Sequence, residues 1–322
     1  MGNFFKSLFS SSEAETSVDE QTKENRKKFD VFKYDGIRAL RMGKVSYGVQ
    51  CFEEALKIEE DIEVLQFLAT AYAALHALDE ALRVTHRLVE LKPEDVNVLL
   101  ARASLFNQAE KGEEAIADCL RVVALDASNP VAWYLMGKVK KSGNDLSGAI
   151  DDLTKAIDIK QDFVDACLLR AEILLELNRS DEALLEMEDL IDLAPEEEAV
   201  YLLRGRVNEH LGNLSAAADD YGQVVILNPF NEEASLLKGA LLMKEGKWEE
   251  AVDFFDEVIE LIPSFSEAYR GRAKAKASKG DNEGAWEDEQ KAVALDAERK
   301  EDEEVGGSKR PNFNDMYKGG IF

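Results

Sequence analysis

Cysteine and histidine are the side chains in this chain best suited to nucleophilic, acid–base or metal chemistry, and only three of each occur. They are Cys51, Cys119 and Cys167, together with His76, His86 and His210. They form no C-x-x-C motif and no Cys/His cluster, so neither zinc nor a disulfide framework is indicated. No glycine-rich phosphate loop, G-x-S-x-G or H-E-x-x-H motif occurs either. We therefore expect no enzyme activity, no metal and no cofactor, and we interpret all six residues as structural.

Acidic residues dominate the charge of the chain. Its 322 residues include 65 Asp and Glu against 39 Lys and Arg, a formal net charge of -26. Phosphate binding needs a basic face, so nucleic acid is not expected as a partner. Hydrophobic residues make up 45% of the chain, enough to bury a core, and no apolar run is long enough to span a bilayer. The charge favours a basic or apolar partner.

A basic and an acidic residue recur sixteen positions apart. The four pairs are Arg102–Asp118, Arg170–Glu186, Arg204–Asp220 and Arg272–Asp288. Two antiparallel helices joined by a short turn would bring the members of each pair together. We interpret the pairs as ion-pair clamps between paired helices. The alternative, an anion-binding row of arginines, stays open.

The pairs follow an internal repeat of 34 residues. Small residues recur at Gly36, Ala69, Ala103, Gly137, Ala171, Gly205, Gly239 and Ala273, with a first spacing of 33 and later spacings of 34. Twelve positions after each comes a second small residue, namely Gly48, Ala81, Ala115, Ala149, Ala183, Ala217, Ala251 and Ala285. The predicted units are 29–61, 62–95, 96–129, 130–163, 164–197, 198–231, 232–265 and 266–299. They form an array over 29–299.

Each unit is predicted to contain two amphipathic helices. In 198–231, Gly212-Asn213 interrupts the first helical pattern and Asn228-Pro229 ends the second. Small residues fall where the two helices would cross, because helices packed within about 8–10 Å cannot both carry large side chains there. The predicted fold is all-α, a solenoid of about eight antiparallel helix-turn-helix repeats.

This pattern resembles the tetratricopeptide repeat (TPR) family. One unit matches its motif at Trp133, Gly137 and Ala149, and another at Gly239, Ala251, Phe255 and Pro263. Lys140 and Asn208 depart from it by replacing an aromatic residue, and Glu289 replaces a large apolar one. The resemblance implies a right-handed superhelix whose first helices line a concave groove.

The groove would be lined by the position three residues before each first small residue. In units three to eight this position holds Leu100, Tyr134, Leu168, Leu202, Leu236 and Arg270. One turn later on the same face lie Ser104, Lys138, Glu172 and Arg206. Such an apolar stripe suits a helix or peptide with hydrophobic anchors. Alternatively, neighbouring helices cover these side chains.

The sequence therefore predicts a cytoplasmic, non-catalytic scaffold or adaptor that holds a protein or peptide in this groove. In the resembled family, members that grip chaperone C-termini carry a Lys/Asn/Arg carboxylate clamp. This chain lacks that clamp, since Ile37 follows Lys33 where Asn is required. The alternative function is a membrane-associated assembly or secretion factor recruited through the N-terminal segment.

Two tails flank the predicted array. Residues 1–28 are predicted to be a disordered tail that starts with a short amphipathic segment bearing Phe4, Phe5, Leu8 and Phe9. Membrane contact (expected to be weak), protein docking and no function all remain open for that segment. It lacks the pattern of a secretory signal, and Lys6 breaks the myristoylation pattern. Residues 300–322 are predicted to be a flexible acidic tail with an aromatic C-terminus. This tail either mediates self-association by occupying a groove or is a frayed end.

Overall fold

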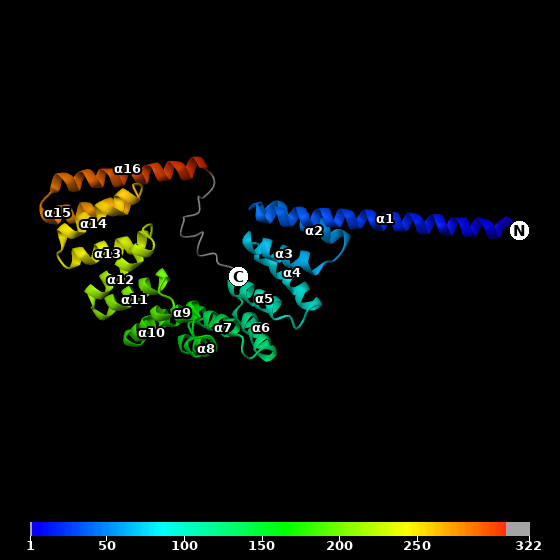
Figure 1. Ribbon diagram of the computed structural model, residues 1–322, viewed down its shortest axis with the longest axis horizontal. Coiled ribbons are helices and arrows are strands. Elements are labelled where there is room, and N and C mark those ends of the chain that lie inside the picture. Colours follow the sequence, from blue (N-terminus) through cyan, green and yellow to red (C-terminus); the bar gives the residue numbers. More distant parts are fainter. Residues whose placement is uncertain (1, 307–322) are drawn as a thin grey trace. The chain divides into compact units, whose positions relative to one another are not determined.

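The structure is a computed structural model that describes the backbone of residues 2–306 and the side chains of residues 21–300, and every regular element in these ranges is an α-helix (Figure 1). The first eight are α1 (Gly2–Arg41), α2 (Val45–Ile58), α3 (Ile62–Ala74), α4 (Leu78–Leu91), α5 (Val96–Gln108), α6 (Gly112–Leu125), α7 (Pro130–Ser142) and α8 (Leu146–Ile159). The next eight are α9 (Val164–Glu176), α10 (Ser180–Leu193), α11 (Glu198–Leu211), α12 (Leu214–Leu227), α13 (Glu232–Lys244), α14 (Trp248–Leu261), α15 (Ser266–Lys279) and α16 (Asn282–Gly306).

Consecutive helices pack in pairs, α1 with α2 through to α15 with α16, which confirms the predicted helix pairs. The chain divides into two compact units, residues 1–160 with α1–α8 and residues 161–322 with α9–α16. The sequence predicts a single array over residues 29–299. The division was not foreseeable because the 34-residue spacing continues unchanged from Gly137 to Ala171.

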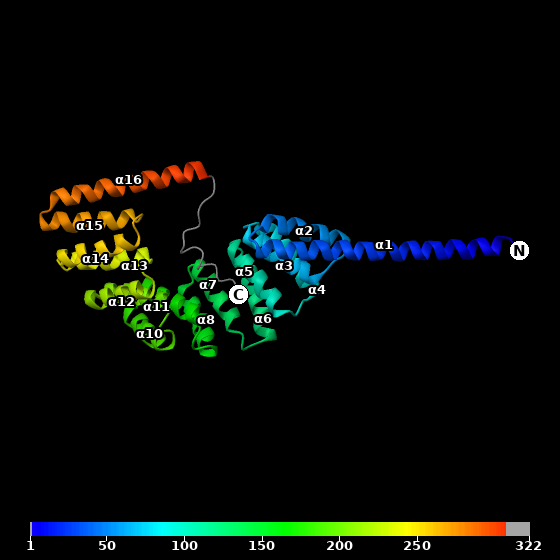
Figure 2. The same cartoon turned by 45° about the horizontal axis from the view of Figure 1, so that its top comes forward.

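Within each unit, the second helix of a pair packs against the first helix of the next pair. These contacts join α2 to α3, α4 to α5 and α6 to α7 in one unit, and α10 to α11, α12 to α13 and α14 to α15 in the other. Figure 2 shows α14, α15 and α16 side by side. First helices also contact each other directly, α5 with α7, α9 with α11 and α13 with α15. First helices of neighbouring pairs therefore share one side of their unit.

Both ends of the described chain are more helical than expected. Helix α1 begins at Gly2, so the backbone of the segment 10–28, expected to be disordered, is helical. Helix α16 continues past the predicted end of the array at residue 299 and ends at Gly306. The predictions for the side chains of Phe4, Phe5, Leu8 and Phe9 and for the aromatic C-terminus lie outside the described residues.

The first small residue of each 34-residue repeat makes room for the side chain sixteen positions later. Where it is glycine, that partner is large: Gly36 with Phe52, Gly137 with Leu153, Gly205 with Tyr221 and Gly239 with Phe255. An added Cβ would lie 2.5 Å from Phe52 at Gly36 and 2.7 Å from Leu153 at Gly137. Where the small residue is alanine, the position sixteen residues later holds Thr85, Cys119, Met187 or Glu289. Glycine therefore lies opposite the three aromatic rings and Leu153, and alanine lies opposite side chains without a ring.

Four first helices begin at a side chain that caps them. Asp61 accepts a hydrogen bond from the Val64 backbone N–H, and Asp95 caps α5 in the same way. Asn129 and Asn231 cap α7 and α13. Each cap satisfies a backbone donor that has no partner inside the helix, which fixes where the first helix starts.

Every turn between the two helices of a pair contains one residue with a left-handed backbone. Four of these residues are glycines, Gly43, Gly212, Gly246 and Gly280, and four are His76, Glu110, Asn144 and Asn178. Asparagine tolerates this conformation best among residues with a Cβ atom, and most other such residues are strained in it. His76 (φ 56°) and Glu110 (φ 58°) are therefore the strained positions.

Replacing Glu110 with glycine should stabilise the first unit. Glycine removes a strain of about 1–2 kcal/mol but loses more backbone entropy on folding, so we expect a net gain of roughly 0.5–1 kcal/mol. Urea unfolding of Glu110→Gly and of the wild-type chain measures the difference. The control is Glu110→Ala, which keeps a Cβ atom and should bring no such gain. Equal stabilisation by both variants would contradict the assignment of strain.

Candidate interaction surface

The residues predicted to line a groove all lie on first helices. We call them the first-helix face, which has one part in each unit. In the first unit it consists of Leu100 and Ser104 on α5 and of Tyr134 and Lys138 on α7. In the second unit it consists of Leu168 and Glu172 on α9, Leu202 and Arg206 on α11, Leu236 on α13 and Arg270 on α15. The contacts of α5 with α7, α9 with α11 and α13 with α15 bring these residues together in neighbouring sets.

The apolar residues of this face are half-buried. Leu100 packs against the hydrophobic core of the first unit. In the second unit, Leu202 packs against the core cluster that contains Tyr221, and Leu236 packs against the one that contains Phe255. Leu100, Leu202 and Leu236 thus contribute to the core on one side and keep part of their surface accessible. Tyr134 and Leu168 are half-buried as well. The observed burial is intermediate between the two alternatives from the sequence, an accessible apolar stripe and side chains fully covered by neighbouring helices.

Exposed polar side chains lie beside them. Lys138, Glu172 and Arg206 are exposed, and Ser104 is half-buried. Arg206 forms an ion pair with Glu233 at the start of the next first helix, α13. Arg270 is held differently, because its guanidinium group pairs with Asp296 and lies 3.7 Å from Glu289, both on α16. Arg270 is therefore engaged inside its own helix pair, and the accessible part of the face in the second unit lies on α9–α13.

The four predicted ion-pair clamps are all present. Arg102 Nε and Nη2 each donate at 2.7 Å to Asp118, and Arg170 Nε donates at 3.0 Å to Glu186. Arg204 Nη2 donates at 2.5 Å to Asp220, and Arg272 Nε donates at 2.9 Å to Asp288. The four acids are largely shielded from water, as are most of the arginines. These arginines are already matched, which supports the structural interpretation over the anion-binding one.

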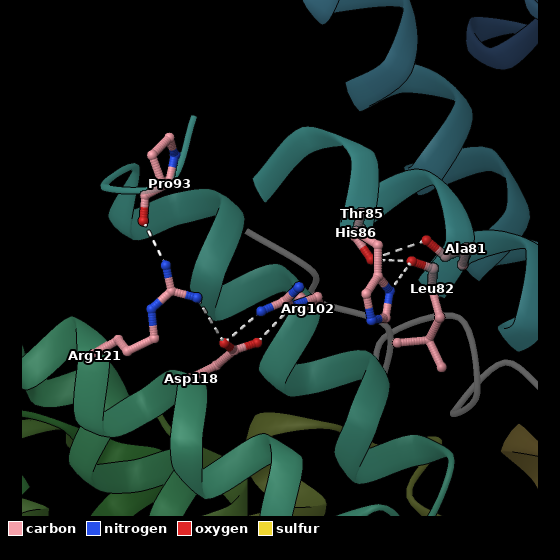
Figure 3. A network of polar contacts seen from close by, with 8 residues as sticks. All are labelled: Ala81, Leu82, Thr85, His86, Pro93, Arg102, Asp118 and Arg121. Carbon is pink, nitrogen blue, oxygen red and sulfur yellow. Dashed lines mark hydrogen bonds and ion pairs between the residues drawn. The ribbon is translucent and has the colours of Figure 1, made fainter. Parts of the chain in front are cut away.

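The clamp around Asp118 also reaches the preceding pair (Figure 3). Arg121, one turn along α6, lies 3.4 Å from Asp118 and donates at 2.8 Å to the backbone carbonyl of Pro93. Pro93 lies in the loop between α4 and α5. The network thus links α5, α6 and the loop that precedes them.

Two units replace the clamp in ways that the sixteen-residue spacing does not predict. In the fourth 34-residue repeat, 130–163, the basic residue is Lys140, one turn later than the usual arginine. Its Nζ lies 2.5 Å from Asp152. In the seventh, Lys238 keeps the basic position, and its Nζ lies 4.7 Å from the centre of the Phe254 ring, which replaces the acid. A search for any cation within one turn of the expected position, and for aromatic residues opposite it, would have found both.

The cysteines and two of the histidines are held by their surroundings, whereas His76 is exposed in the turn between α3 and α4. All three cysteines are buried and free. Burial raises the pKa of the Cys119 thiol to about 12 and that of Cys167 to about 11, so neither forms a reactive thiolate at neutral pH. His86 Nδ1 lies 2.6 Å from the Leu82 carbonyl (Figure 3), and His210 Nδ1 lies 2.8 Å from Ser180 Oγ. Within residues 21–300, no group of three acidic, cysteine or histidine side chains could hold a metal ion.

Two clamp carboxylates should titrate in opposite directions. Burial raises the pKa of Glu186 above its ordinary value, despite the opposing contacts with Arg170. Burial also opposes ionisation of Asp288, but hydrogen bonds from Arg272 and Lys276 outweigh it and lower the pKa. Ionised Asp288 therefore stabilises the fold at pH values above its unfolded-state pKa, and this stabilisation is lost as pH falls through the lower folded-state pKa. Glu186 has the opposite sign, because the fold favours its protonated form.

Carbon-detected NMR titration of the side-chain carboxyl groups measures both pKa values. We expect the midpoint for Glu186 to lie above that of exposed glutamates and the midpoint for Asp288 to lie below that of exposed aspartates. Lys276→Met should move the Asp288 midpoint upward, since it removes one of the two cations. A shared, unshifted midpoint for both groups would contradict the geometry of the clamps.

None of the helices in the described part of the chain is both long enough and apolar enough to cross a membrane. This includes the 40-residue helix α1.

Comparison with known proteins identifies the repeat. A family model described as tetratricopeptide repeat matches residues 68–130, 168–232 and 211–264, and a second model of the same description matches residues 130–163. A DnaJ homolog subfamily C member 7 homolog from Schizosaccharomyces pombe is 26% identical over 137 residues, which cover 38% of this chain. The match spans only 29% of that relative, less than a third of its length.

A solved structure shares the fold. A tetratricopeptide repeat protein from Parabacteroides merdae has a TM-score of 0.57 at 18% identity, over 83% of this chain and 99% of its own. The protein YrrB, described as a TPR protein with an unusual peptide-binding site, has a TM-score of 0.45 at 21% identity, over 57% of this chain and 95% of its own.

Proposed function

Because the chain belongs to the tetratricopeptide repeat family, we propose that it is a non-catalytic scaffold or adaptor whose first-helix face holds a peptide or helix of another protein. Stacked repeats of this kind present extended surfaces built from equivalent positions of successive units. The observation that carries the proposal is the row of half-buried aliphatic side chains on neighbouring first helices, flanked by exposed charged ones. Such a mixture suits a partner with spaced apolar anchors.

The net negative charge of the chain favours basic partners over acidic ones. A formal net charge of -26 disfavours acidic partners and nucleic acids through long-range repulsion. Glu172 is exposed one turn along α9 from Leu168 in the second unit. We therefore expect a peptide that combines apolar anchors with basic residues.

The variant Leu168→Asp plus Leu202→Asp should lose binding of such a partner. Each aspartate would place a charge where an apolar anchor needs to be desolvated, so we expect affinity to fall by at least tenfold. The matched control is Leu185→Asp plus Ile226→Asp, which introduces the same charges on second helices of the same unit, at side chains that are 63% and 73% exposed. Pull-down with quantified partner recovery compares the two variants with the wild-type chain.

Circular dichroism checks that both variants remain folded, since Leu202 also contributes to the core. If the first variant unfolds, Leu168→Ala plus Leu202→Ala removes the anchors without adding charge. A folded first-helix variant that keeps every partner would contradict the proposal. Loss of binding by the second-helix variant alone would place the site elsewhere.

A further inference from the structure

The outer side of the last described helix, α16, carries two exposed apolar side chains. Trp286 is 65% exposed and Val293 is 52% exposed. They stand seven residues apart, so they lie on the same face of the helix. Both are available for contact with another segment.

Six earlier second helices are each followed by a first helix in the same compact unit. In these six helices, the side chains equivalent to Trp286 and Val293 are covered. Their counterparts are Val49, Leu82, Ile116, Leu184, Ala218 and Val252 at the position of Trp286, and Leu56, Val89, Val123, Ile191, Val225 and Ile259 at that of Val293. All of these side chains are buried or half-buried. Helix α16 therefore keeps apolar residues at the positions where a following first helix packs in the earlier pairs.

The sequence that follows α16 has the pattern of a first helix. Lys318-Gly319-Gly320-Ile321 repeats the order basic, small, variable, aliphatic. The same order occurs as Lys238-Gly239-Ala240-Leu241 in α13 and as Arg204-Gly205-Arg206-Val207 in α11. Phe313, Met316, Tyr317 and Ile321 also have the spacing that places side chains on one face of a helix.

We propose that residues 313–322 pack as a short helix, antiparallel to α16, over Trp286 and Val293 of the same chain. The lengths agree with this arrangement. From Gly306 back to Val293 is about 20 Å along the helix, and the six residues 307–312 span up to about 20 Å when extended. If Phe313 lies beside Val293, Gly320 lies beside Trp286. Gly320 comes seven residues after Phe313, Trp286 comes seven residues before Val293, and the two helices run antiparallel. Gly319 and Gly320 leave space for the indole ring.

Charge complementarity favours this occupant over a second copy of α16. Helix α16 has ten acidic and three basic residues, a net charge of -7. Residues 307–322 contain three basic residues and one acidic residue, a net charge of +2. Lys309 and Arg310 would run back beside the acidic stretch 301–304. Two α16 helices facing each other would instead bring like charges together.

Fluorine NMR of the chain labelled with 5-fluorotryptophan tests the proposal. The signal of Trp286 is assigned by its loss in Trp286→Phe, and its accessibility is measured as broadening by a soluble nitroxide. We expect broadening in the full chain to be several-fold weaker than in a chain that ends at Gly306. A synthetic peptide of residues 307–322 added to the shortened chain should restore the protection.

Two full-length variants provide matched controls. Phe313→Asn plus Met316→Asn removes anchors and should expose Trp286, whereas Asp315→Asn, on the opposite side of the proposed helix, should leave it protected. Equal accessibility of Trp286 in the full and shortened chains would overturn the proposal. Protection of Trp286 that disappears on dilution, together with a dimer in analytical ultracentrifugation, would also overturn it. So would binding of the peptide that perturbs Leu168 and Leu202 instead of Trp286.

Discussion

Gly239→Val should destabilise the second unit by roughly 3 kcal/mol, the upper part of the range for an overpacked core. The Phe255 ring lies against two glycines, Gly239 on α13 and Gly271 on α15, and a Cβ atom at either position would collide with ring carbons. Phe255 is almost completely buried, so a shift of its ring would displace neighbouring core side chains. Urea unfolding followed by tryptophan emission in a Trp133→Phe background reports on this unit, because the two remaining tryptophans, Trp248 and Trp286, both belong to it.

The neighbouring residue supplies the control for this prediction. Ala240 is exposed on the same helix, so Ala240→Val should change the free energy of unfolding by at most about 0.5 kcal/mol. A double-mutant cycle isolates the cause. Gly239→Ala should cost less in a Phe255→Leu background than in the wild-type chain, because the smaller side chain leaves space. Additive effects would show that the ring is not what limits Gly239.

Asp220→Ala should destabilise the second unit by roughly 3–5 kcal/mol, the cost of leaving a shielded cation without its partner. The Asp220 side chain is only 4% exposed and that of Arg204 is 25% exposed. Arg204 donates to both oxygens of this carboxylate, and Asn208 Nδ2 donates to it at 3.0 Å. Urea unfolding of the full-length variant measures the loss.

Two further variants separate a buried clamp from a surface ion pair. Glu182→Ala removes the partner of Arg179 from an exposed pair at the start of α10 and should cost less than about 1 kcal/mol. Arg204→Met plus Asp220→Leu removes both charges and should recover most of the stability lost in Asp220→Ala. If the double variant were as unstable as the single one, the unpaired charge would not be the cause.

The 34-residue period of small residues in the sequence was sufficient to predict the helix pairs. Small residues such as Gly205 and Ala217, and breakers such as Pro229, give the position of every helix crossing and turn over the array. The ends were harder to predict, because the segment 10–28 is polar and lacks the apolar periodicity that marks a packed helix, yet its backbone is helical in α1. The division after Lys160 leaves no trace in the spacing.

The candidate site was predicted unevenly. Salt-bridge partners such as Arg102 and Asp118 were predictable because the turn fixes their separation at sixteen residues. The pairing of Arg270 with Asp296 was not, since those residues stand twenty-six positions apart and face each other only once α16 is in place. Nor does a helical pattern tell how much of Leu168 or Leu202 a neighbouring helix covers. That fraction depends on the crossing of adjacent pairs, which spacing does not determine.

The matching of glycine to a large side chain has a consequence for how such a chain can be recombined. A first helix with alanine at the small position cannot replace one with glycine, since its Cβ atom would collide with the large side chain sixteen positions later, such as Tyr221 or Phe255. Most hairpins would transplant as complete modules. The seventh is an exception, because Phe255 also needs Gly271 of α15. A chimera that ends after α14 should therefore keep its shape only if the module that follows carries a glycine at that position.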